Sequence, residues 1–150
     1  MKILHVISSL NLQAGGVAQG VISITGFYQN SGVEPTVLSF DEPEDDLPET
    51  EHLTVIRMGK GKSGVFSYHP QLVPWLKQHA NEYDAVIVDG LWQYHGYGVY
   101  NALKEANVPY YVFTHGMLDP WFKHEYPLKH LKKYVYWFLA QYPVLKNAKA

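Results

Sequence analysis

Short apolar runs alternate with segments of helical periodicity along this chain, and that order constrains the fold more than any other feature. The apolar runs lie at residues 2–7, 34–40, 53–58, 84–89 and 110–114, and the helical patterns at residues 17–28, 70–80, 97–106 and 128–142. Such alternation is typical of a parallel sheet with helices packed on both faces. We therefore predict an α/β fold with a Rossmann-like parallel sheet in the strand order 3-2-1-4-5.

Length and composition narrow the class of protein. The 150 residues fit one domain, and 47% hydrophobic with 17% charged residues indicates a globular chain. The sequence holds no cysteine, which excludes a disulfide scaffold and suits a reducing, cytoplasmic compartment. A formal net charge of −2 gives no basic field for nucleic acid. No apolar run approaches the roughly 18 residues of a membrane-spanning helix.

Charge is distributed unevenly along the chain. Residues 41–51 hold seven of the fourteen acidic residues and two prolines. We expect a solvated surface loop there, the alternative being a partner-binding or regulatory segment. The helix expected from Leu128 to Tyr142 has an apolar stripe and a lysine-rich face. Packing of the stripe on the sheet is the favoured interpretation, and peripheral contact with an anionic membrane is the alternative.

A ligand site is expected where the strand order reverses, between the first and fourth strands, at their carboxyl ends. Gly15 and Gly16 stand there, just before the first helix, where backbone amides and the helix dipole favour a phosphate. They do not form a G-x-G-x-x-G motif, and a simple flexible loop is the alternative. We assign Gly15 and Gly16 as candidate phosphate-binding residues.

Two further segments follow strand ends at this edge. His115 comes directly after the fifth strand with Gly116 behind it, where a histidine can donate a hydrogen bond to a ligand or move a proton. Capping of the local backbone is the equally weighted alternative for His115. Asp119 lies in the following turn, and we favour it as the N-cap of a short helix.

The segment after the fourth strand offers groups that suit a sugar. Asp89 can bind a hydroxyl, and Trp92, Tyr94 and His95 belong to an aromatic cluster on which a sugar ring could stack. Ordinary packing of a loop over the sheet is the slightly favoured alternative for that cluster.

Metal binding is not expected. His5, His95 and His115 could converge at the same sheet edge, but the eight histidines form no H-E-x-x-H pair.

Four motifs together resemble the N-terminal domain of retaining GT-B glycosyltransferases of family 4, also called group 1. They are MKILHV at residues 1–6 before Gly15 and Gly16, YDAVIV at 83–88 before GLW, PYYVFTHGMLDPW at 109–121, and PVLKNA at 143–148. The third is the most specific, and the resemblance covers essentially the whole chain.

This resemblance implies two Rossmann-like domains facing a cleft, of which residues 1–150 form the acceptor-side domain. The nucleotide-sugar-binding C-terminal domain, with its two glutamates seven residues apart, is expected to be missing. The implied reaction is metal-independent, cofactor-free transfer of a hexose from a nucleotide-sugar to a sugar or lipid-linked acceptor, with retention. The neutral residues 17–19 leave the diphosphate without a charged partner on this helix.

The resemblance also implies site roles. Gly15 and Gly16 would approach the donor diphosphate, and His115 would be catalytic, facing the donor sugar. Residues assigned to acceptor or sugar binding are Asp89, Trp92, Tyr94, His95, Gly116 and Asp119. A stand-alone Rossmann-like module for a nucleotide or phosphosugar, or a truncated interaction protein, are the alternatives, and the chain alone is expected to have little activity.

Overall fold

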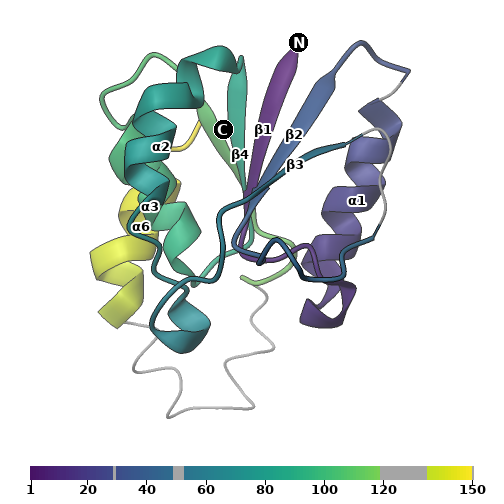
Figure 1. Cartoon of the computed structure of the whole chain (residues 1–150). Helices are drawn as coiled ribbons and strands as arrows, with labels where there is room; N and C mark the ends of the chain where they lie inside the picture. The colour runs from purple at the N-terminus through teal and green to yellow at the C-terminus, as the bar shows by residue number, and fades with distance from the viewer. Residues whose placement is uncertain (29, 49–52, 119–134, 150) are drawn as a thin grey trace.

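A five-stranded parallel sheet forms the centre of the computed structural model, which describes residues 1–28, 30–48, 53–118 and 135–149 (Figure 1). The strand order is β3-β2-β1-β4-β5, as predicted. All neighbouring strands pair in parallel. The strands are β1 (Lys2–Ile7), β2 (Glu34–Ser39), β3 (Thr54–Arg57), β4 (Ala85–Asp89) and β5 (Tyr110–Phe113).

Helices cover both faces of the sheet, which confirms the predicted Rossmann-like class. α1 (Gly16–Tyr28) lies on one side, while α2 (Leu72–His79), α3 (Tyr94–Leu103) and α6 (Tyr142–Asn147) lie on the other (Figure 1). Short helical turns are η1 (Leu12–Ala14), η2 (Gly64–Phe66), η3 (Ala80–Glu82) and the π-helical η4 (Trp137–Gln141).

Side-chain alternation along the central strands separates two buried layers. Leu4 and Val6 of β1 pack with α2 and α3, whereas Ile7 packs with Val21 of α1. His5, between Leu4 and Val6, therefore faces the α1 side, and its ring lies 6.0 Å from that of Tyr28. Because each fully buried aliphatic side chain contributes about 1.5–3 kcal/mol, both layers stabilise the sheet.

The helix after β4 begins earlier than predicted. α3 starts at Tyr94 and ends at Leu103, not at residues 97 and 106. Gln93 is extended and the chain becomes helical directly after it. Tyr94 and His95 are therefore buried helix residues rather than loop residues. The other described elements start and end within two residues of their predicted bounds, apart from the C-terminal helix.

The acidic segment is solvated only in part. Glu44, Asp45 and Asp46 are exposed, as expected. Asp41 is 4% exposed, and its carboxylate accepts hydrogen bonds from the Ser9 hydroxyl (2.5 Å) and the Leu10 amide (2.8 Å). The expectation of a solvated loop is wrong for Asp41, because this carboxylate holds the loop that follows β1.

The C-terminal helix presents its apolar stripe to solvent where it is described. Val135, Phe138, Leu139 and Tyr142 are 57%, 63%, 71% and 47% exposed, while Ala140 and Val144 are buried. The favoured packing of this stripe on the sheet is therefore wrong for these four residues, and residues 128–134 lie outside the described part. Within the described chain, no helix is long and apolar enough to cross a membrane.

Candidate functional site

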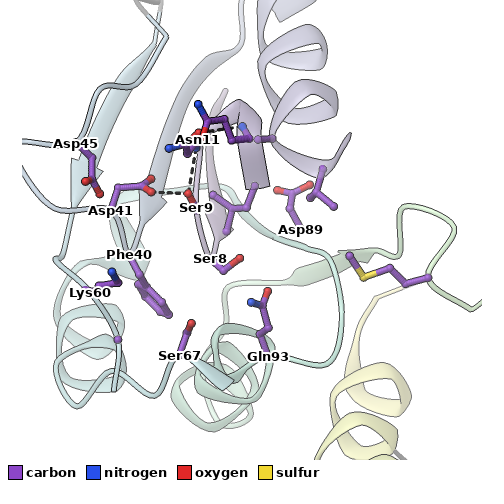
Figure 2. Close-up of a pocket in the computed structure, with 16 residues that line it drawn as sticks. Ser8, Ser9, Asn11, Phe40, Asp41, Asp45, Lys60, Ser67, Asp89 and Gln93 are labelled. Carbon is purple, nitrogen blue, oxygen red and sulfur yellow. Dashed lines mark hydrogen bonds between the residues drawn. The ribbon is translucent and has the colours of Figure 1, made fainter. Parts of the chain in front are cut away.

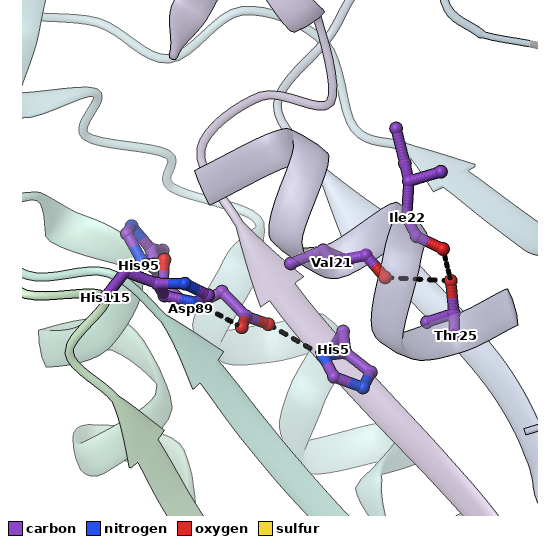
Figure 3. Close-up of polar contacts among 7 residues, drawn as sticks. All are labelled: His5, Val21, Ile22, Thr25, Asp89, His95 and His115. Atoms are coloured by element: carbon purple, nitrogen blue, oxygen red, sulfur yellow. Dashed lines mark hydrogen bonds and ion pairs between the residues drawn. The ribbon is translucent and has the colours of Figure 1, made fainter. Parts of the chain in front are cut away.

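Asp89 ends β4 and is the centre of a hydrogen-bonded group at the carboxyl edge of the sheet (Figure 3). Its Oδ2 lies 2.7 Å from Nδ1 of His5, and its Oδ1 lies 2.9 Å from Nε2 of His115. The side chains of Asp89 and His5 have no exposed surface, whereas that of His115 is 21% exposed. Strands β1 and β4 and the loop after β5 therefore bring three titratable side chains together.

The protonation of this group follows from its contacts. Burial by itself raises the pKa of the Asp89 carboxyl, but hydrogen bonds from His115 and His5, with their charges, hold it below its ordinary value. An ionised carboxylate only accepts hydrogen bonds, so His5 donates from Nδ1 and His115 from Nε2. Asp89 thus orients the His115 ring and leaves Nδ1 as the second nitrogen available for chemistry.

His95 contacts the backbone of Asp89. Its Nε2 donates to the Asp89 carbonyl oxygen at 2.9 Å, and the ring is fully buried. Burial lowers the pKa of His95 to about 4. His95 is therefore neutral near pH 7 and fixes the backbone of the strand end.

His115 packs against a glycine of α1. A Cβ added at Gly20 would lie 3.3 Å from Cε1 and 3.4 Å from Nδ1 of His115. The φ of His115 is +48°, and Gly116, Gly90 and Trp92 also have positive φ. Backbone in this region is uncommon for residues other than glycine, and such positions gather at functional sites.

A pocket of about 550 Å³ opens beside Asp89, between the loops that follow β1, β2, β3 and β4 (Figure 2). This position is where parallel α/β sheets bind ligands. Its lining includes Ser8, Ser9, Asn11, Gln13, Phe40, Asp41, Asp45, Lys60, Gly61, Ser67, Asp89, Gln93 and Met117.

Comparison of the sequence with protein families identifies the family of this chain. The model of the family described as Glycosyltransferase Family 4 matches residues 14–150. The chain belongs to glycosyltransferase family 4. No curated protein matches it significantly.

Two solved structures show the same fold as this family 4 chain. An oxidoreductase, ylbE, from Lactococcus lactis is 14% identical with a TM-score of 0.54, over 96% of this chain and 61% of its own. A Rossmann-fold NAD(P)-binding family protein from Shigella flexneri is 16% identical with a TM-score of 0.51, over 97% of this chain and 64% of its own. The family 4 chain thus spans less than two thirds of either, and these likenesses concern the fold alone.

The glycine pair lies at the start of α1. Gly15 has a φ of +125°, and Gly16 is the first residue of α1. A Cβ at either position would meet nothing within 4 Å. The Gly15 amide donates a long hydrogen bond of 3.4 Å to the Leu12 carbonyl, and the space beside both glycines is open. The role of Gly15 and Gly16 in phosphate binding stays a prediction.

The aromatic segment divides into different environments. Tyr94 is 8% exposed and its ring packs edge-on against that of Tyr68. Tyr94 therefore follows the alternative interpretation, in which the aromatic side chains pack ordinarily against the protein. Fully buried His95 offers no surface to a sugar. Trp92 is half-buried beside Trp137, and its backbone amide donates to Gln141 Oε1 at 3.0 Å. The expected stacking platform of loop aromatics is therefore not formed by Tyr94 and His95, because both lie inside α3.

The structure places the other residues that the sequence assigned to the site as follows. Gly116 is exposed with a φ of +74°, next to His115. Asp119 lies outside the described residues. Among the residues that are described, no three His, Asp or Glu side chains are arranged to hold a metal ion. His5, His95 and His115 do converge, but on the oxygen atoms of Asp89.

Sequence reasoning missed several residues of this site. The sequence suggests His5 only as a possible metal ligand. In the structure His5 pairs in register with Ile87, so strand alternation places it on the same face as Asp89. Asp45 and Lys60 carried no local motif, because their place at the pocket depends on contacts between two loops.

Proposed function

We propose that this chain is the acceptor-side half of a retaining glycosyltransferase that moves a hexose from a nucleotide-sugar to a sugar or lipid-linked acceptor. The observation that carries the proposal is the Asp89–His115 pair beside a pocket at the carboxyl edge of a family 4 domain. A second domain that binds the nucleotide completes the cleft.

Charge develops on the diphosphate as it leaves the sugar. The amides of Gly15 and Gly16, with the dipole of α1, stabilise that charge. The backbone approach is supported by the open space beside both glycines. No metal or cofactor takes part in this proposal.

His115 contacts the donor sugar near the reacting carbon. Asp89 fixes the Nε2 proton of His115, so the ring is held in one tautomer and one orientation before the donor binds. Preorganisation of this kind lowers the cost of reaching the transition state.

The decisive experiment measures nucleoside diphosphate release from UDP- and GDP-hexoses by the full-length protein. We expect His115→Ala to lower the rate by about 10²-fold. His79→Ala, at a partly exposed histidine of α2, is the control and should leave the rate unchanged. Unchanged turnover in His115→Ala contradicts the assigned role.

A stand-alone nucleotide-binding module is the competing function, favoured by the pocket lying wholly on this chain. Calorimetric titration of residues 1–150 with UDP and GDP separates the two. Tight binding without a second domain supports the module, and weak binding supports the half-site.

The proposed place of action is the cytoplasmic face of a membrane, with peripheral contact through the segment from Leu128 to Tyr142. The exposure of Phe138 and Leu139 supports this contact. Binding to phosphatidylglycerol vesicles in a sedimentation assay should fall when Lys129, Lys132 and Lys133 are changed to Gln. Binding that ignores these changes contradicts an electrostatic contact.

A further inference from the structure

One wall of the pocket is a turn fixed by an arginine. Nη1 of Arg57 donates to the carbonyl oxygens of Pro43 at 2.8 Å and Asp45 at 2.9 Å. Oδ2 of Asp45 in turn accepts from the Glu42 amide at 2.8 Å. Asp45 is therefore held in a defined position at the pocket although its side chain is exposed.

The neighbouring loop, after β3, is joined to this turn. The Lys60 amide donates to Glu42 Oε1 at 2.9 Å, and the Gly59 amide donates to the Asp41 carbonyl at 3.1 Å. A Cβ at Gly61 would lie 2.6 Å from the Ser67 backbone, so only glycine allows this close approach. These contacts place Lys60 at the same pocket as Asp45 (Figure 2).

The charges of the lining disfavour an anion. Three acidic residues, Asp41, Asp45 and Asp89, and one basic residue, Lys60, line the pocket, and the Asp89 carboxylate has no exposed surface. Both oxygens of Asp41 are engaged by Ser9 and Leu10, and both of Asp89 by histidines. Asp45 and Lys60 are thus the charged pair positioned to meet a ligand.

Neutral hydrogen-bonding groups complete the lining. Ser8, Ser67 and Gln93 contribute hydroxyls and an amide, and the volume of about 550 Å³ is that of a small-molecule site. A hydroxyl both donates and accepts, so adjacent hydroxyls could bond a carboxylate and an ammonium together.

We propose that this pocket is an acceptor subsite for an uncharged, polyhydroxylated ring, and that Asp45 and Lys60 determine its specificity. Asp45 accepts from one ligand hydroxyl, Lys60 donates to another, and the carboxylates reject acceptors that carry a phosphate or carboxylate. The inference rests on the proposed function for the identity of the ligand as an acceptor.

Chemical-shift titration of the ¹⁵N-labelled chain tests this directly. The probes are methyl glycosides of glucose, galactose and mannose, the matching glucuronide, and glucose 6-phosphate. We expect at least one neutral glycoside to shift the amides of Ser8, Gly61 and Ser67, with a Kd about threefold or more below those of the anionic probes.

Three variants test which residues cause the preference for neutral over anionic probes. Asp45→Asn keeps an acceptor for the Glu42 amide and should reduce the preference for the neutral probe about two- to threefold. Lys60→Gln should raise the Kd of the neutral glycoside about threefold. Asp46→Asn removes the same charge from the adjacent exposed residue and should change neither, and the spectra report folding of each variant.

Three results overturn the proposal: shifts by no neutral glycoside, anionic probes that bind as tightly, or equal effects of Asp45→Asn and Asp46→Asn. None requires catalysis. A different assay tests the proposed function. That function fails if the full-length protein releases no nucleoside diphosphate from nucleotide-sugars.

Discussion

Oδ1 of Asp89 and Nε2 of His115 lie 2.9 Å apart, at the ends of adjacent strands β4 and β5. The other carboxylate oxygen is engaged by His5 of β1 on the opposite side of β4. One buried acid thus holds histidines from two flanking segments, which makes the carboxyl edge dependent on a single side chain.

Asp89→Asn should destabilise the fold by about 2–4 kcal/mol, because an amide nitrogen cannot accept the hydrogen bond that one histidine donates. Urea unfolding at pH 7 measures this loss. Asp46→Asn, at an exposed residue, is the control and should stay within about 0.5 kcal/mol of wild type. Equal stability of the two variants contradicts an anchoring role for Asp89.

Low pH should remove the extra stability that Asp89 gives the fold relative to Asn. The pKa of Asp89 is lowered in the fold, so its contribution is present above the unfolded value of 3.8 and is lost as the pH falls through the folded pKa. The difference in unfolding free energy between wild type and Asp89→Asn should therefore shrink below pH 3.8. A difference that grows there contradicts the direction of the shift.

His95 should make stability depend on pH in a higher window. Its pKa falls from 6.5 to about 4 on folding, so between these values the unfolded chain binds a proton that the folded chain does not. Stability therefore rises with pH across the window, by at most about 1.4 kcal/mol per unit from this group. His95→Gln keeps a donor for the Asp89 carbonyl, and its unfolding free energy should show a smaller slope from pH 4 to 6.5. An unchanged slope contradicts a buried neutral histidine.

The sheet could be predicted from sequence because its signals are local. Consecutive apolar residues at 85–88 indicate a strand covered on both faces, and the alternation with helices favours this order of strands. The start of α3 could not, because Tyr94 and His95 look like polar aromatic loop residues until tertiary packing buries them.

The site was predictable only in part. Asp89 and His115 follow strand ends, which a topological rule brings together. His5 could have been placed on their face by strand alternation, had the register of β1 and β4 been known. The pocket wall depends on long-range contacts of Arg57 with residues 42–45, for which the sequence holds no motif.

Two glycines of α3 should respond oppositely to alanine. At Gly98 the new Cβ would clash with Cδ2 of fully buried Leu72, so Gly98→Ala should lower the free energy of unfolding by about 1–3 kcal/mol through overpacking. At Gly96 the nearest atom, on Val88, is 3.4 Å away, so Gly96→Ala should gain up to about 1 kcal/mol in helix propensity. Thermal unfolding compares the pair, and a stabilised Gly98→Ala would show that α2 and α3 pack less closely than described.

Gly20→Ala should separate the placement of His115 from the stability of the fold. Alanine favours the helix by about 1 kcal/mol, but its Cβ would lie 3.3 Å from His115 Cε1 and push the half-exposed loop outward. The displacement lengthens the 2.9 Å contact between His115 and Asp89. We therefore expect unfolding free energy to change by less than about 1 kcal/mol while turnover of the full-length protein falls by about tenfold. Ser23→Ala, at an exposed residue of the same helix, gains propensity without touching His115 and should leave turnover unchanged. If both variants keep wild-type turnover, the position of the His115 ring against α1 does not matter for the reaction, and its assignment near the reacting carbon fails.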